Sequence, residues 1–242
     1  SEYSRFIGDI FGVPLAIEFI TGALIDRRPV ARIGPLELVA VWWGETWRSF
    51  KVFNIDQAWR ADFPERPLAR DPSRPTVLLV HGYMCNRATW RHWLMNGIPS
   101  RWNVATVNLE PVFGTVQHYA NVVHDAVERL RSATGAERIT LVCHSMGGLV
   151  ARAALAGDAG RVRRAVQIGS PNLGSFAPVL ALRGVYPTVR KLAALDTHHD
   201  AEELARIVFR SLPALHELLP DPALIGGPDL FDEAAWPAGP LR

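Results

Sequence analysis

The segment Ile139–Gly148 constrains this chain more than any other part of its sequence. A short run rich in β-branched residues ends at Ser145, and two glycines open a helical pattern directly afterwards. A strand that turns abruptly into a helix exposes a serine hydroxyl at the top of a parallel sheet, a geometry known as a nucleophile elbow. Serine is a poor nucleophile unless strain, a helix N-terminus and a nearby base activate it. The sequence therefore predicts a nucleophilic serine at position 145.

One position departs from the usual Gly-x-Ser-x-Gly pattern of this turn. Cys143 stands where the first glycine would be. The position needs a small side chain, because strand and helix approach each other closely in the elbow. A cysteine side chain is small enough, so we expect the turn to form.

A second motif lies upstream, where residues 75–80 read as a buried strand that ends in His81-Gly82-Tyr83. With these two motifs the chain resembles the α/β-hydrolase superfamily, in particular bacterial lipases and esterases. The turn at residues 169–175 and the segments 212–220 and 229–232 resemble bacterial lipases and relatives of lecithin–cholesterol acyltransferase. The resemblance spans residues 75 to 235.

The resemblance implies an oxyanion hole formed by the backbone N–H groups of Tyr83 and Met146. Two preorganised amides, one of them at a helix N-terminus, favour negative charge at that point. Removing one such donor typically costs about 3 kcal/mol of transition-state stabilisation. His81 and His144 flank the two motifs, and we interpret both as structural.

Strand and helix patterns alternate along the middle of the chain. Strands are predicted at 76–81, 103–108, 139–143 and 164–168, with helices at 88–96, 116–130 and 148–155. This alternation predicts a doubly wound parallel α/β sheet that binds its ligand at the carboxyl ends of the strands. The predicted organisation is a helical N-terminal segment with a linker (1–74), an α/β-hydrolase-like core (75–175) and a helical cap (176–242).

In the family that the chain resembles, an acid and a histidine follow the serine on loops after later strands. No segment after Ser175 reads as a strand. We therefore expect a sheet that lacks the last strands, with the fourth strand at its edge, and we interpret the chain as an incomplete hydrolase, a fragment or a chimera. The candidate bases are His198, His199 and His216, and helix capping or packing explains these histidines better than catalysis. Asp196 and Asp200 are possible acids only if one of these histidines is the base.

The composition and the motifs of the chain exclude several classes of binding partner. A net charge of +2 without a basic stripe argues against nucleic acid. The sequence has no phosphate-binding loop, nicotinamide fingerprint or spaced set of metal ligands, which predicts catalysis without cofactor or metal. Two cysteines make no disulfide framework, and we expect free thiols at Cys85 and Cys143. The apolar segment 6–25 contains two carboxylates, which favours an amphipathic helix packed on the domain or lying on a membrane surface over a bilayer span.

These observations predict a serine ester hydrolase that acts on small or lipid-like carboxylic esters through an acyl-enzyme at Ser145. Two alternatives stay open. The first alternative is a non-catalytic scaffold without the acid and the histidine. The second is an acyltransferase that delivers the acyl group to an alcohol. The bacterial cytoplasm or a membrane surface is the expected location.

Overall fold

The structure is a computed structural model that describes residues 34–186, 189–190, 193–194, 196, 198–226, 229–230 and 232. The chain divides into two compact units, Ser1–Phe63 and Pro64–Arg242. The predicted amphipathic segment 6–25 lies outside the described residues, so its contact with a membrane stays a prediction.

The described part of the first unit is a helical run. It begins with α3 (Pro35–Phe50), continues through a π-helical turn (Lys51–Asp56) and ends with α4 (Gln57–Trp59). The Asp56 carboxylate is buried, and it pairs with the Lys51 ammonium and, at 3.4 Å, with the Arg60 guanidinium. A buried carboxylate needs such partners because burial disfavours an isolated charge.

The second unit contains the predicted parallel sheet. Its four strands are β1 (Thr76–Val80), β2 (Asn103–Val107), β3 (Ile139–His144) and β4 (Val162–Ile168), in the order β2-β1-β3-β4. The central strand β1 is buried along its whole length, because it has neighbours on both edges and cover on both faces. The prediction of a parallel α/β sheet is confirmed.

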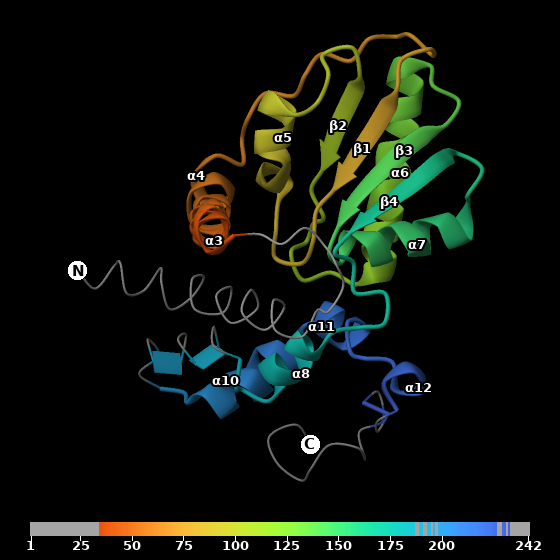
Figure 1. Cartoon of the computed structure of the whole chain (residues 1–242). Coiled ribbons are helices and arrows are strands. Elements are labelled where there is room, and N and C mark those ends of the chain that lie inside the picture. The colour runs from red at the N-terminus through yellow and green to blue at the C-terminus, as the bar shows by residue number, and fades with distance from the viewer. Residues whose placement is uncertain are drawn as a thin grey trace. The chain divides into compact units, whose positions relative to one another are not determined.

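Two long helices cover one face of the sheet. The helix α6 (Val116–Thr134) packs on β1 and β2, and α7 (Gly147–Gly157) packs on β3 and β4. Gly135 ends α6 in a left-handed conformation with a φ of 76°. Figure 1 shows both helices on the same side of the sheet. The predicted helix 88–96 begins as a 3₁₀ turn (Arg87–Trp90), which contacts β1 and β2, and continues as α5 (Arg91–Asn96).

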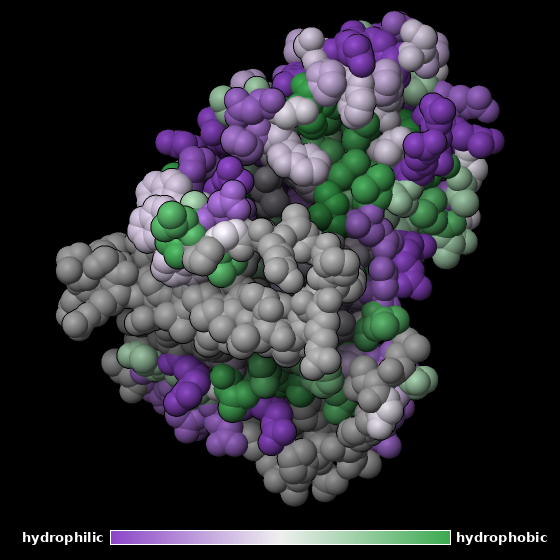
Figure 2. Space-filling model, in the orientation of Figure 1, coloured by the Kyte–Doolittle hydropathy of each residue, from purple (hydrophilic) through white to green (hydrophobic). Residues whose placement is uncertain are grey.

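The second face of the sheet is open over β4 in the described part of the chain. Arg164 and Val166 of β4 share this face with Thr140 and Val142 of β3, because they are paired in register. The Val166 side chain is 45% exposed. Figure 2 shows hydrophobic residues at the surface over the sheet. As predicted, β4 lies at the edge of the sheet.

Helices make up the described part of the predicted cap, which we call the helical cap. They are α8 (Phe176–Leu182), α10 (Ala201–Ile207), a 3₁₀ turn (Phe209–Ser211), α11 (Pro213–Glu217) and α12 (Pro222–Ile225). Asp200 and Glu203 form a reciprocal capping box at the start of α10. The cap has a hydrophobic cluster of its own around Leu182, Leu215 and Leu219.

The helical cap is tied to the core through α11. Ala214 and Leu218 belong to the hydrophobic cluster between the sheet and α6. The Glu217 carboxylate accepts a hydrogen bond of 2.7 Å from the Val116 N–H at the start of α6. In Figure 1 the carboxyl ends of the strands point toward α11.

The irregular segment before β1 is fixed to the second unit. Arg66 donates hydrogen bonds to the carbonyl oxygens of Leu94 and Ile98, and Asn103 exchanges two hydrogen bonds with the backbone of Ala69. No helix among the described residues is long and apolar enough to cross a bilayer.

Candidate active site

Ser145 occupies the turn between β3 and α7. Its φ of 54° lies in the left-handed region, which side chains other than glycine rarely adopt. Its N–H donates a hydrogen bond of 2.9 Å to the Ile168 carbonyl at the end of β4, and its own carbonyl accepts one of 3.0 Å from Gly148. The hydrogen bonds to Ile168 and from Gly148 therefore stabilise the strained backbone conformation of Ser145.

Two glycines make the close approach of β1 and the elbow possible. A Cβ on Gly82 would lie 2.8 Å from the Ser145 Cβ, and a Cβ on Gly147 would lie 2.6 Å from the His81 carbonyl oxygen. Real Cβ atoms do not come that close to other heavy atoms. The backbone that follows β1 therefore packs directly against the serine.

This approach brings together the predicted oxyanion-hole residues. Tyr83 follows Gly82 directly, and Met146 follows Ser145 and caps α7. Within the described part of the chain, no backbone or side-chain group accepts a hydrogen bond from the N–H of Tyr83 or of Met146. The N–H groups of the residues that follow Gly82 and Ser145 thus keep their donors available among the described residues.

His81 has a structural role that its hydrogen bonds define. Its side chain is 2% exposed. The Leu109 N–H donates to Nε2 at 3.0 Å, so the ring proton resides on Nδ1 and donates to the Gly82 carbonyl at 2.9 Å. Burial lowers the pKa of His81 below its usual value of 6.5. The ring is neutral and joins the turn after β1 to the segment after β2.

The residues just before the serine differ in environment. The His144 ring packs edge-on against Trp90 with centroids 6.4 Å apart, and burial lowers its pKa. The Cys143 side chain is fully buried in the core between β3 and the helices. Burial raises the pKa of the Cys143 thiol to about 12. Cys143 therefore serves as a small apolar group in the elbow.

Neither cysteine forms a disulfide, as expected. The reactivity of the two thiols therefore tests how far each cysteine is buried. We expect a maleimide at pH 8 to modify the partly exposed Cys85 and to leave Cys143 unmodified in the folded protein. The thiolate is the reacting species, and a thiol with a pKa of about 12 is almost entirely protonated at that pH. Peptide mapping after labelling checks this, and equal modification of the two residues in native protein would contradict it.

The candidate acid and two of the candidate histidines form a local cluster. His199 Nδ1 lies 3.0 Å from an Asp196 carboxylate oxygen. The other Asp196 oxygen accepts the backbone N–H groups of His198 and His199. These hydrogen bonds lower the pKa of Asp196, the backbone bond from His198 most strongly. The cluster closes a turn, and it also contains an ionised carboxylate that orients an imidazole.

His216 lies in α11 and has a partner of its own. Its Nε2 donates a hydrogen bond of 2.9 Å to the Arg210 carbonyl within the helical cap. In the described part of the chain, the Ser145 hydroxyl hydrogen-bonds to none of these histidines, and no group of three or more ligand side chains could bind a metal.

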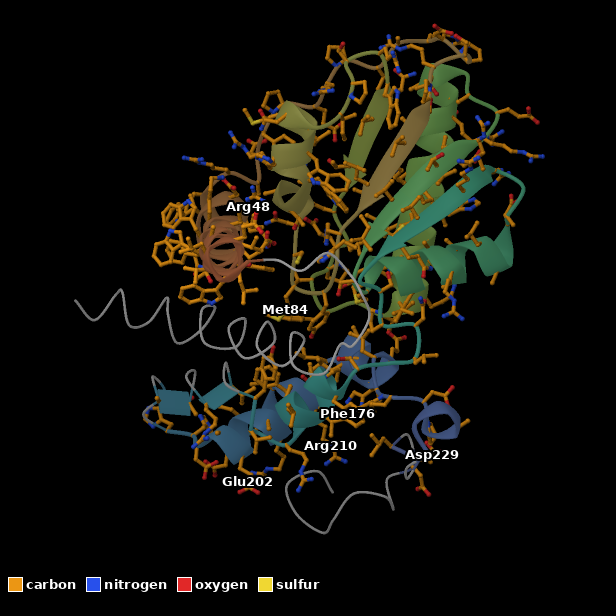
Figure 3. The ribbon with its side chains drawn as sticks, viewed as in Figure 1. Arg48, Met84, Phe176, Glu202, Arg210 and Asp229 are labelled. Atoms are coloured by element: carbon orange, nitrogen blue, oxygen red, sulfur yellow. The ribbon has the colours of Figure 1, made fainter. Side chains whose placement is uncertain are left out.

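Tyr83 also links the core to the helical cap. Its ring packs against the hydrophobic cluster of the sheet and against the cluster of the cap. Burial raises the pKa of its hydroxyl to about 12. The next residue, Met84, has a φ of 52° and is 58% exposed. In the view of Figure 3, Met84 lies between the ends of the strands and Phe176, the first residue of α8.

The sequence model of the family described as "alpha/beta hydrolase fold" matches residues 75–218. The chain belongs to the α/β-hydrolase family. The match begins at the strand β1 and ends in the helical cap, so it contains both motifs of the site.

Individual hydrolases are similar to parts of this chain. The lysosomal thioesterase PPT2 of Mus musculus is 29% identical over 136 residues, which are 52% of this chain and 43% of the mouse protein. The chain thus spans less than half the length of this curated relative. Among solved structures, the Bacillus licheniformis lipase BlEst2 in its propeptide form has a TM-score of 0.44 at 22% identity, over 63% of this chain and 32% of the lipase. The naproxen esterase of Bacillus subtilis has a TM-score of 0.36 at 20% identity, over 69% of this chain and 63% of the esterase.

Several features of the site carried no recognisable sequence signal. The left-handed Met84 is one, because methionine has no preference for that conformation. The polar contacts around the end of β4 are another, since Gln167 precedes the turn motif at residues 169–175 and that motif predicts no contact between Gln167 and Asn172. The bond between His81 and the Leu109 N–H joins segments that are distant in the sequence.

Proposed function

We propose that this α/β-hydrolase cleaves carboxylic esters or thioesters through an acyl-enzyme at Ser145. The observation that carries the proposal is the strained Ser145, which packs against Gly82. Among the described residues, the N–H groups of the neighbouring Tyr83 and Met146 have no hydrogen-bond acceptor. Preorganised donors beside a nucleophile stabilise the charge that develops in acyl transfer.

In this mechanism the Ser145 Oγ attacks the carbonyl carbon of the substrate while a base takes its proton. The carbonyl oxygen becomes an oxyanion that accepts hydrogen bonds from the Tyr83 and Met146 amides. Collapse of the tetrahedral intermediate releases the alcohol or thiol, which takes the proton, and leaves the acyl group on Oγ. Water then attacks the acyl-enzyme, and the acid product leaves.

The substrate class rests on the surroundings of the serine. The helical cap presents an apolar cluster, and Tyr83 packs against it beside the elbow. This favours an acyl group that is hydrocarbon-like. Mouse PPT2 is named a thioesterase, which extends the proposal from oxygen esters to thioesters.

The pair of His199 and Asp196 is our candidate for the base. Its Nδ1–carboxylate distance of 3.0 Å is that of an imidazole oriented by an acid. The second candidate function, a non-catalytic scaffold, is favoured by a different observation. In the described part of the chain, the hydrogen bonds of His81, His199 and His216 go to groups other than the Ser145 hydroxyl.

Labelling with a fluorophosphonate separates the two functions, because the reagent modifies serines that a base has activated. We expect stoichiometric addition to the wild-type protein, mapped to Ser145, and none to Ser145→Ala. The variants His199→Ala, His198→Ala and His216→Ala then locate the base, since loss of the base lowers the rate on the order of a millionfold. Folded wild-type protein that takes up no label would establish the scaffold and refute the proposed enzyme.

A further inference from the structure

We propose that Gln167, held by Asn172, positions the first turn of α7 and with it the nucleophile elbow. The inference rests on the proposed function for what the elbow does, but its structural part stands independently. Both residues lie outside the motifs that define the elbow, at the end of β4 and in the turn that follows it.

The first contact joins β4 to the helix. Gln167 Nε2 donates a hydrogen bond of 3.2 Å to the Gly148 carbonyl in the first turn of α7. Gly148 allows this proximity, because a Cβ at that position would lie 2.0 Å from Ser170 Oγ and 3.2 Å from Gln167 Cγ. The side chain of Gln167 thus reaches over the helix start at van der Waals distance.

A second contact fixes the orientation of the Gln167 amide. Asn172 Nδ2 donates a hydrogen bond of 2.8 Å to Gln167 Oε1, so the Nε2 group must face the Gly148 carbonyl. Asn172 Oδ1 in turn accepts a hydrogen bond of 3.2 Å from Arg152 at the exposed surface of α7. The Arg152–Asn172 and Asn172–Gln167 hydrogen bonds are both exposed, whereas the bond from Gln167 to Gly148 is partly buried. Exposed hydrogen bonds contribute little, so the effect of this series of hydrogen bonds is concentrated at Gln167.

The turn that carries Asn172 is itself held by the helical cap. The Leu173 carbonyl accepts from the Asp221 N–H at 3.1 Å, and the Ser175 N–H donates to the Leu218 carbonyl at 2.9 Å. Gly174 has a φ of 80° and packs so closely on Leu219 that a Cβ would lie 2.2 Å from its carbonyl oxygen. Asn172 is therefore presented from a well-fixed backbone.

The elbow depends on this side of the fold for its position. The backbone N–H of Ser145 is already anchored to the Ile168 carbonyl, next to Gln167. The Gln167–Gly148 bond adds an anchor on the far side of the serine, so that the Met146 amide lies between two points tied to β4. Loss of the second anchor releases the first helical turn and with it the donor proposed for the oxyanion.

The test measures hydrogen exchange and labelling in the same set of variants. Gln167→Ala removes the anchor, and Asn172→Asp replaces the Nδ2 donor by an oxygen while it keeps the acceptor for Arg152. The matched control is Arg164→Ala, an exposed residue on the same strand. We expect amide exchange in a peptide covering residues 144–151 to accelerate about fivefold in Gln167→Ala and to stay unchanged in the control.

The labelling readout distinguishes positioning from a loss of stability. We expect the maximal rate of fluorophosphonate addition to fall about fivefold, with the half-saturating reagent concentration unchanged. In a Gln167→Ala background, Asn172→Ala should add no further loss, because the two residues act as one chain. Additive effects, or exchange of the 144–151 peptide at the wild-type rate, would overturn the proposal.

An inactive wild-type protein and an unfolded variant would each give a result that can be interpreted. If the wild-type protein takes up no label, the proposed function fails, and the exchange rates alone decide whether Gln167 holds the helix start. If Gln167→Ala does not fold, Asn172→Asp carries the test at an exposed site, and unchanged exchange in that variant overturns the inference.

Discussion

Substitution of Gly147 by alanine is expected to destabilise the protein by about 3 kcal/mol and to abolish reaction at Ser145. The added Cβ would lie 2.6 Å from the His81 carbonyl oxygen and 2.9 Å from the Val80 carbonyl oxygen. Both are backbone atoms of a fully buried strand and the turn after it, so neither can rotate aside as a side chain would. The helix start must move away from β1, and the serine moves with it.

The same helix offers a matched control for this experiment. Gly157, at the other end of α7, has open space around the position of a Cβ. Alanine there should be neutral or stabilising by up to about 1 kcal/mol, because it lowers the entropy of the unfolded chain. Urea denaturation of both variants measures the difference in the free energy of unfolding. Equal stabilities would show that β1 and α7 are not in the close contact described.

Replacement of His81 by leucine should destabilise the protein by about 2 to 3 kcal/mol. The change deprives the Leu109 N–H of its acceptor and the Gly82 carbonyl of its donor, in a site where the side chain is 2% exposed. The control is His92→Leu, at an exposed position in α5, for which we expect a change within about 0.5 kcal/mol.

His81 also gives the protein a pH dependence whose sign is fixed. Its pKa is lowered in the folded state, so below pH 6.5 the unfolded chain takes up a proton that the folded chain does not. The stability that the neutral ring provides is complete above pH 6.5 and is lost as the pH falls toward the folded-state pKa. His144 contributes with the same sign. Denaturation of the wild type and His81→Leu at pH 7.5, 6.5 and 5.5 should show a smaller decline in the variant, and parallel declines would refute the assignment.

The elements with short-range signals were predictable. The strand-to-helix change at Ser145 and the capping box of Asp200 and Glu203 depend on neighbouring residues, so the sequence contains their whole cause. The strand β4 illustrates the limit. Its predicted start at Arg164 is too late, because Arg163 and Arg164 are exposed at a sheet edge and their polarity conceals the strand that begins at Val162.

The supporting contacts of the site were not predictable from single positions. The orientation of the His81 ring depends on the segment after β2. The orientation of the Gln167 side chain depends on Gly148 in α7, the helix that follows the neighbouring strand β3. Such contacts arise from how elements pair in space, for which the sequence has no local pattern.

The anchoring of Ser145 sets an order on biosynthesis. Its left-handed backbone lies against Gly82, in the turn after β1, and its N–H donates a hydrogen bond to the Ile168 carbonyl at the end of β4. On the ribosome, β1 and β3 can emerge and pair before β4 is made, but the serine then lacks the acceptor for its own N–H. The proposed nucleophile therefore gains this second anchor only when β4 has left the exit tunnel and joined the sheet.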